Sequence, residues 1–185
     1  MRVINQQNIE GGMYLPYVAE VYYRSLWIND NLSTTTTITQ DRLYAIPFYV
    51  HTGHTFDRIG VRVTTGVNNG HLRIGIYKDS SGLPGSLVSD AGAVTMSGTG
   101  AQDAEVTISQ YLSIGHYWLA VVGDSGPALL AAATSANRGD FGDASLAATL
   151  STQRVYVAHT YAALPTTFGT PTLETTQAMC LKLRA

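Results

Sequence analysis

Strict two-residue alternation of apolar and polar side chains between residues 56 and 78 constrains the fold more than any other feature. FDRIGVRVTT and HLRIGIYKD both carry it, with Ile59, Val61, Val63, Leu72, Ile74 and Ile76 as the apolar members. A period of two with β-branched residues is typical of half-buried strands. GVNNG between them contains Asn-Gly, which favours a tight turn. The pattern therefore predicts two strands joined as a β-hairpin.

Further strand patterns follow along the chain. RLYAIPFYV is apolar on both faces, but Pro47 cannot donate to a ladder, so we expect it at an edge, a bulge or a strand end. Other predicted strands are SLVSDAGAVTM with a bulge at Gly92, AEVTIS with Val106 and Ile108 inward, GHYWLAVVG as a central strand, and a last one with Met179, Leu181 and Leu183 inward. About eight strands at spacings of roughly 8 to 15 residues indicate a sandwich or barrel.

Two segments leave their secondary structure open. ALLAAA at 128–133 fits either a strand or a helical turn, and ASLAATL at 144–150 is the best helix candidate but is short. The connections elsewhere are too short for parallel crossovers, so antiparallel pairing is expected. We predict an all-β chain: an antiparallel, jelly-roll-like β-sandwich over residues 34–185.

Residues 1–33 differ from the rest and are predicted to form an extended arm. MYLPYVAEVYYRSLWIND holds four tyrosines and a tryptophan without clean alternation, and LSTTTTITQ links it to the first clear strand. Either the arm packs on a neighbouring molecule or it packs on its own sandwich. Buried aromatics commonly anchor protein contacts, and the candidate docking residues are Tyr14, Tyr17, Tyr22, Tyr23 and Trp27.

The glycine-rich segment DSSGLPGS at 79–86 is predicted to be a turn and not a ligand loop. Phosphate loops need a following helix and usually a lysine, whereas a strand pattern follows here. Asp79 begins no EF-hand, because the remaining spacing and the terminal glutamate are absent.

GDSGPA at 123–128 is similar to the GDSGGP segment of trypsin-like proteases. It lacks one glycine, and no AAHC context for a histidine occurs in the chain. Ser125 is therefore a poor nucleophile candidate, and a loop after a central strand accounts for these residues. We expect no catalytic residues.

Metal candidates are few, and no metal or other cofactor is expected. His51 and His54 are spaced for two zinc ligands, but a third ligand is not evident. Asp140 and Asp143 stand in a glycine-rich loop and suit either calcium or simple Asx-turns.

The amino-acid composition limits the classes of partner that we expect the chain to bind. Charged residues are 13% of the chain, about half the usual share. Lys78 and Lys182 are the only lysines, and the net charge is −2, which disfavours nucleic acid. Eleven tyrosines beside so few lysines resemble the composition of interface cores. No run suits a membrane span and no secretory signal is visible. Cys180 is predicted to be a buried or half-buried residue of the last strand and not a nucleophile.

Residues 37–124 resemble a module of tailed-bacteriophage structural proteins. The resemblance lies in RLYAIPF, TFDRIGV, LRIGIY with GLPGSLV and DAG, and a closing segment TIS with YWLA. It implies a jelly-roll-like domain on the surface of a virion, assembled in the host cytoplasm, and brings no catalytic residues. Only a short arm precedes the module, which favours a capsid decoration protein or a head- or tail-attached knob.

Two functions follow as expectations. The first is a non-enzymatic virion component that contacts the major capsid protein or other virion proteins and associates with itself, most simply as a homotrimer. The alternative is a receptor- or carbohydrate-binding tip module of a tail fibre that recognises a host surface glycan. Its candidate stacking residues are Tyr77, Tyr111, Tyr156 and Tyr161.

Overall fold

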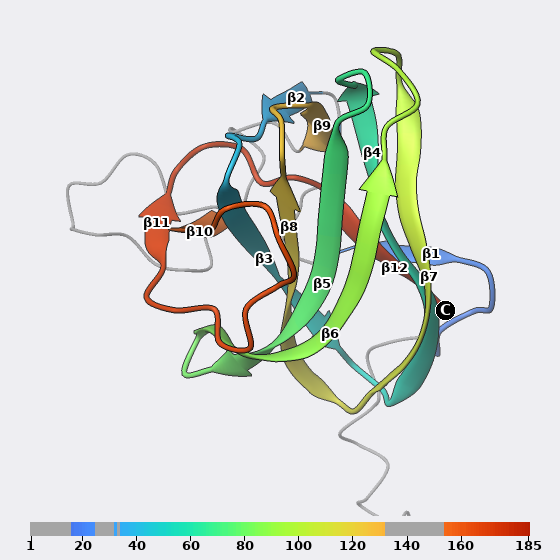
Figure 1. Cartoon of the computed structure of the whole chain (residues 1–185). Helices are drawn as coiled ribbons and strands as arrows, with labels where there is room; N and C mark the ends of the chain where they lie inside the picture. Colours follow the sequence, from blue (N-terminus) through green and yellow to red (C-terminus); the bar gives the residue numbers. More distant parts are fainter. Residues whose placement is uncertain (1–15, 25–31, 33, 132–153) are drawn as a thin grey trace, which may run out of the picture.

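The computed structural model describes residues 16–24, 32, 34–131 and 154–185. Sheet A has the order β1-β12-β4-β9-β2, with β7 on the other side of β4, and sheet B has the order β11-β10-β3-β8-β5-β6 (Figure 1). The strands are β1 Tyr22–Arg24, β2 Thr34–Thr37, β3 Arg42–Val50, β4 His54–Thr65, β5 His71–Ser80, β6 Leu83–Thr95, β7 Gln102–Leu112, β8 Gly115–Gly123, β9 Ala128–Ala131, β10 Arg154–Ala158, β11 Thr172–Glu174 and β12 Leu181–Arg184. Every pairing between them is antiparallel, so the predicted β-sandwich is confirmed.

Six consecutive strands form one long hairpin that is rolled into both layers. β5 pairs with β6, β4 with β7 and β3 with β8, so each strand before the central turn pairs with its counterpart after that turn. The β4–β7 pair lies in sheet A and the other two pairs lie in sheet B. β8 also pairs with β5, which places β8 at the centre of sheet B, as predicted. This nested pairing gives the sandwich its jelly-roll-like character.

The tip of the rolled hairpin is the turn at Ser81–Gly82. Both residues have positive φ, 55° and 83°, as a type I′ hairpin turn requires. Asp79 accepts a hydrogen bond from the Gly82 N–H at 3.0 Å, which holds the turn closed. The segment 79–86 therefore contains a turn, as predicted, but the turn is shorter than expected: only residues 81 and 82 connect the strands, and the rest of the segment belongs to β5 and β6.

The predicted hairpin between β4 and β5 is wrong. The turn itself is tight, since the Gly70 N–H donates to the Val67 carbonyl at 2.9 Å and Asn69 has a φ of 57°. However, β4 lies in sheet A and β5 in sheet B. Both strands bury one apolar face, and stacking those faces against each other hides both from water. The turn therefore crosses between the layers.

The main core fills the space between the two sheets. Its fully buried members include Phe48, Ile74, Ile76 and Leu119 of sheet B and Phe56, Ile59, Val63 and Leu181 of sheet A. Burying each of these side chains stabilises the fold by about 1.5–3 kcal/mol compared with leaving it exposed to water. Cys180 is also fully buried, as predicted, and burial raises the pKa of its thiol.

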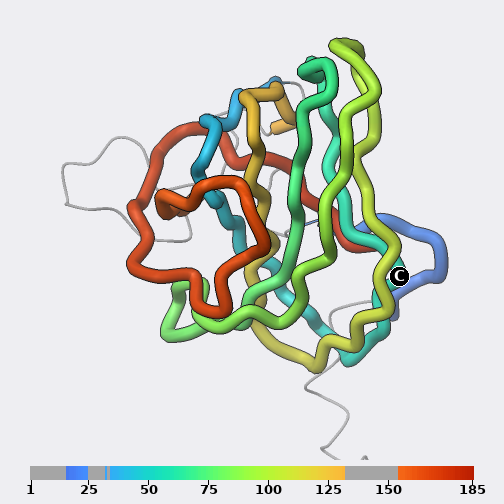
Figure 2. The backbone as a smooth tube through the Cα atoms, in the orientation of Figure 1, coloured from blue at the N-terminus to red at the C-terminus, as the bar shows by residue number. Residues whose placement is uncertain are grey.

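A second apolar cluster lies on the outer face of sheet B, beneath residues 159–171. Figure 2 shows that segment as an orange-red loop over the sheet. Trp118, Tyr77 and Ala120 of the sheet pack there against Leu164 and Phe168 of the loop. The Tyr77 hydroxyl donates to the Pro165 carbonyl at 2.9 Å. Two-sided burial explains why GHYWLAVVG is apolar throughout.

Asp90 anchors this covering loop to the sheet. Its carboxylate accepts hydrogen bonds from Arg73 Nε at 2.9 Å, from the Gly92 N–H at 3.1 Å and from the Leu164 N–H at 3.0 Å. Burial would raise the pKa of Asp90, but these hydrogen bonds outweigh it and hold the pKa below its usual value. The ionised form of Asp90 is therefore the one that stabilises the fold.

Irregularities in the ladders match the sequence signals. Ala91 is an extra residue between the Ile74–Gly92 and Gly75–Asp90 pairs, so the bulge falls at the predicted place, and Gly92 has a φ of 105°. Pro47 lies within β3 and pairs there with Trp118 of β8. The pairing of β10 with β3 begins at Ala45, so among the described residues no strand pairs with the other side of β3 at the proline. Val106 and Ile108 pack against the core.

The structure assigns the secondary structure of one of the two segments that the sequence left ambiguous. Ala128–Ala131 is a strand, and the predicted link through the threonines contains β2, which pairs with β9. Residues 144–150 lie outside the described part of the chain, as do residues 1–15 of the predicted arm.

Replacing Gly82 with alanine is expected to lower the free energy of unfolding by about 1–2 kcal/mol, because a Cβ disfavours the left-handed backbone there. Urea denaturation measures the change. Gly98→Ala is the matched control, since its new methyl would meet no atom within 4 Å and its φ is not positive. Equal stability of the two variants would contradict the role of the turn.

Asp90→Asn is expected to lower the free energy of unfolding by about 1.5–3 kcal/mol at pH 7, through loss of charge-assisted hydrogen bonds. Because folding lowers the pKa of Asp90, its contribution is present above about pH 4 and is lost as the pH falls below that. Urea denaturation at pH 7 and pH 3 should therefore show a gap that closes in acid. Asp103→Asn, in an exposed pair with Arg62, should change stability by less than about 1 kcal/mol.

Candidate functional site

Three of the predicted docking tyrosines lie in the described residues, and all three pack on the chain's own sandwich. The Tyr17 ring lies 4.2 Å from the His51 ring and 5.1 Å from the Phe56 ring, and burial raises its pKa to about 12. Tyr22 and Tyr23 belong to β1, which pairs with β12 at the edge of sheet A. Of the two arrangements that the sequence left open, residues 16–24 adopt the second. Tyr14 and Trp27 lie outside the described residues.

The four predicted glycan-contact tyrosines are not brought together. Tyr77 has no exposed surface, so a stacking role for it is wrong: the covering loop buries its ring. Tyr111 on β7 is 61% exposed, whereas the Tyr156 ring on β10 lies beneath the Arg42 guanidinium at 4.5 Å. Tyr161 belongs to the covering loop and lies beside His71. No ring contact joins any two of these four within the described residues.

The predicted metal candidates also have other surroundings. The Tyr17 ring lies against both His51 and His54, at 4.2 and 5.2 Å between ring centres. Asp140 and Asp143 fall outside the described residues. Across the described ranges, no three His, Cys, Asp or Glu side chains gather closely enough to hold a metal ion.

Ser125 lies near a histidine–carboxylate pair but is not aligned with it. His71 Nδ1 is 2.6 Å from Asp124 Oδ2, and the His71 N–H donates to Asp124 Oδ1 at 2.7 Å. Burial would raise the pKa of Asp124, but these hydrogen bonds hold it below its usual value. The Ser125 hydroxyl is buried, and no hydrogen bond joins it to an imidazole in the described part of the chain.

A hollow of about 250 Å³ lies on the outer face of sheet A. Its floor is Gly60, which sits in one cross-strand row between Lys182 of β12 and Glu105 of β7. A Cβ at Gly60 would lie 2.8 Å from the Ala104 carbonyl oxygen, so only glycine leaves this space open. The lining residues are Tyr22, Gly60, Val61, Arg62, Asp103, Ala104, Glu105 and Lys182.

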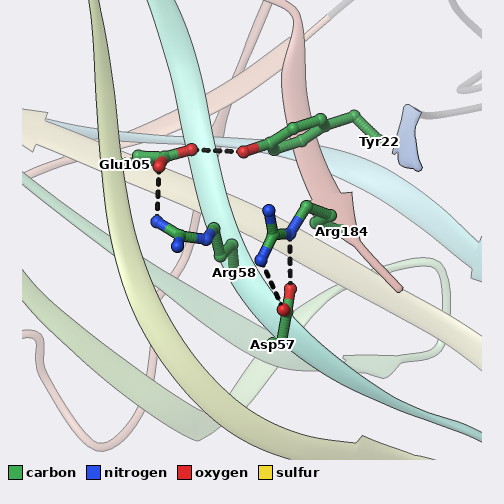
Figure 3. A network of polar contacts seen from close by, with 5 residues as sticks. All are labelled: Tyr22, Asp57, Arg58, Glu105 and Arg184. Atoms are coloured by element: carbon green, nitrogen blue, oxygen red, sulfur yellow. Dashed lines mark hydrogen bonds and ion pairs between the residues drawn. The ribbon is translucent and has the colours of Figure 1, made fainter. Parts of the chain in front are cut away.

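Polar contacts fix the side chains around this hollow, which we call the Gly60 hollow. Figure 3 shows Glu105 between Tyr22 and Arg58: one carboxylate oxygen accepts from the Tyr22 hydroxyl and the other from Arg58 Nη1 at 2.6 Å. Below them, Arg184 donates two hydrogen bonds to Asp57, at 2.8 and 2.6 Å. These contacts tie β1, β12, β4 and β7 together across the face.

The charges around the hollow are mostly paired. Arg58 neutralises Glu105, Arg62 lies 3.0 Å from Asp103, and Arg184 holds the pKa of Asp57 below its usual value by hydrogen bonding. Lys182, in contrast, forms no ion pair with any residue that the structure describes. Because Arg58, which stands beside the lining, pairs with Glu105, and Arg62 pairs with Asp103, Lys182 is the one cation of the lining whose charge no described carboxylate balances.

This arrangement suits recognition of a polar ligand. Asp103 and Glu105 offer carboxylate oxygens as hydrogen-bond acceptors, and the Lys182 ammonium offers three donors. Tyr22, a residue that is 40% exposed, adds an aromatic ring. In the sequence, Arg62 and Lys182 are outward members of alternating strands, and nothing local marks them as parts of a site. Gly60 within the alternating strand was the available signal, because a strand-interior glycine often marks a close approach of a ligand or another backbone.

No protein-family model, curated protein or solved structure matches the chain. Within the described ranges, the structure contains no helix long and apolar enough to span a membrane.

Glu105→Gln is expected to lower the pKa of the Tyr22 phenol. Burial and the Glu105 carboxylate both raise that pKa, whereas Arg184 and Arg58 lower it, so removing the carboxylate charge leaves the arginines to act. Titration of the chain with ¹³C-labelled tyrosine, followed by NMR, measures the change. Asp103→Asn serves as the control and should leave Tyr22 unaffected; an unchanged Tyr22 pKa in Glu105→Gln would contradict the contact.

Proposed function

We propose that this chain is a non-enzymatic structural component of a tailed-phage virion, displayed on the particle surface as a capsid decoration protein or a head- or tail-attached knob. The supporting observation is the extent of the resemblance. It covers residues 37–124, and the rolled hairpin runs from β3 to β8, residues 42–123. The resemblance therefore spans one complete folding unit and not scattered pieces of strand.

Self-association is part of this proposal. Only 13% of the residues are charged, so charge repulsion opposes the close approach of identical faces less than in an ordinary protein. β6, β11, β1, β2 and β7 each have only one strand neighbour within the described residues. Such edges are where further strands or neighbouring copies can pair. A homotrimer is the proposed state, with other virion proteins as partners.

The test is the presence and copy number of the chain in purified particles. Quantitative mass spectrometry of particles made by the genome that encodes it should find the chain as a stoichiometric component. Hundreds of copies indicate a capsid location, and a few to a few dozen indicate the tail or a vertex. Absence from intact particles, with the chain present in the infected lysate, would contradict the proposal.

A second candidate function is carbohydrate recognition at the particle surface. The Gly60 hollow favours it, because carboxylates, an exposed tyrosine ring and a lysine meet in one concavity. Sugar sites combine an apolar face with a few placed polar groups. Of the predicted stacking residues, Tyr111 remains exposed but lies outside this hollow. Saturable binding of a soluble sugar to the whole chain would support the function, and loss of that binding in Tyr22→Ala but not in Tyr111→Ala would place it at the hollow.

A further inference from the structure

We propose that the Gly60 hollow binds an acidic saccharide, with Lys182 pairing the sugar's carboxylate and Asp103 and Glu105 accepting hydrogen bonds from its hydroxyls. The inference rests on the second candidate function and adds the chemical class of the ligand. It is carried by the charge, the size and the donor–acceptor pattern of the lining residues.

The charge argument starts from Lys182. It lines the hollow, and among the described residues no carboxylate pairs with it. Each arginine at the hollow already has a partner: Arg58 pairs with Glu105, and Arg62 with Asp103. A single uncompensated ammonium matches a ligand with one negative charge. A charge-assisted hydrogen bond is roughly twice as strong as a neutral one, so it can discriminate between ligands.

The donor–acceptor pattern excludes a simple anion site. Asp103 and Glu105 line the same hollow, so a ligand with two or more negative charges meets like-charge repulsion. Their free lone pairs need donors, and ring hydroxyls are suitable ones. Hydrogen bonds from the paired arginines hold these carboxylates in place. A ligand with one carboxylate and several hydroxyls satisfies both halves of the lining.

The size and shape suit one sugar ring. The hollow measures about 250 Å³, just below the usual range of roughly 300–1,000 Å³ for small-molecule pockets. Its floor is the bare backbone at Gly60, and Tyr22 on β1 stands at its side with a partly exposed ring. A tyrosine ring can stack on the apolar face of a sugar, and the hydrogen bond from its hydroxyl to Glu105 holds that ring in one orientation.

The chain offers a direct probe because Lys78 and Lys182 are its only lysines. Biosynthetic ¹³C-lysine gives two side-chain signals, which Lys78→Arg and Lys182→Arg assign. Lys78 is exposed on β5 of sheet B, away from the hollow, and is the internal control. The whole chain is titrated separately with glucuronate, glucose and inorganic phosphate.

The expected result is a saturable shift of the Lys182 signal with glucuronate, while the Lys78 signal stays fixed. Glucose should bind at least about 10-fold more weakly, as expected when one charge-assisted contact is lost. Lys182→Met should remove the preference for glucuronate, and Lys78→Met should keep it. Circular dichroism and thermal melting confirm that both variants are folded.

Other results overturn the inference in distinguishable ways. Equal binding of glucose and glucuronate, with Lys182 unmoved, would leave carbohydrate recognition standing and remove the acidic class. Phosphate binding as tightly as glucuronate would reduce the hollow to a general anion site. No response to any sugar would reject both this inference and the second candidate function, and the presence of the chain in virions would be unaffected.

Discussion

The type I′ turn at Ser81–Gly82 is the local constraint on which the strand pairing of the rolled hairpin depends. The β5–β6, β4–β7 and β3–β8 pairs are nested around it, so the position of the turn sets which residues face each other in three successive strand pairs. The β5–β6 pair is the most local, and the β3–β8 pair joins residues more than sixty positions apart. Loop-closure entropy makes the distant pairs costly until the nearer ones exist. The turn therefore has an energetic role well beyond its own hydrogen bond.

The two outer faces of the sandwich have opposite characters. Residues 159–171 cover the outer face of sheet B and convert it into a second apolar core. The outer face of sheet A instead carries paired charges around a concavity. A face covered by the chain's own loop offers little to a partner, so recognition by this domain is expected at sheet A or at the sheet edges. The polar network also joins β1 and β12 to the rolled hairpin across that face.

Local patterns in the sequence predicted the strands well, because alternation and turn chemistry are short-range properties. The central position of β8, a turn within residues 79–86 and the bulge next to Gly92 all followed from neighbouring residues, although the turn is shorter than the predicted segment. Which strands pair with each other could not be predicted from these local patterns. Asn69–Gly70 makes a tight turn in either arrangement, and only the burial of two opposed faces decides that β4 and β5 stack instead of pairing. A twelve-residue strand whose neighbours all lie far along the chain carries no local mark of that choice.

Two further features had no local signal. The covering segment at 159–171 has no alternation of apolar and polar residues. By the alternation of its strand, Tyr77 is an outward residue, but that segment buries it. The Gly60 hollow depends on Lys182 and Glu105 standing on either side of one glycine, although they are more than seventy residues apart. A single sequence shows each of these residues but not their shared row. Lys182 and Gly60 are therefore visible in the sequence, but the site that they form is not.

Nested pairing has a consequence for changes in chain length. Removing or adding one residue within a strand would shift the register of the strand pairs that follow it, moving away from the central turn, by one residue. A one-residue register shift turns buried side chains to the solvent face. The same change in the bends at 51–53, 66–70, 96–101 or 113–114 leaves the ladders in phase. Homologous chains should therefore vary in length at those four bends and keep the spacing between them constant.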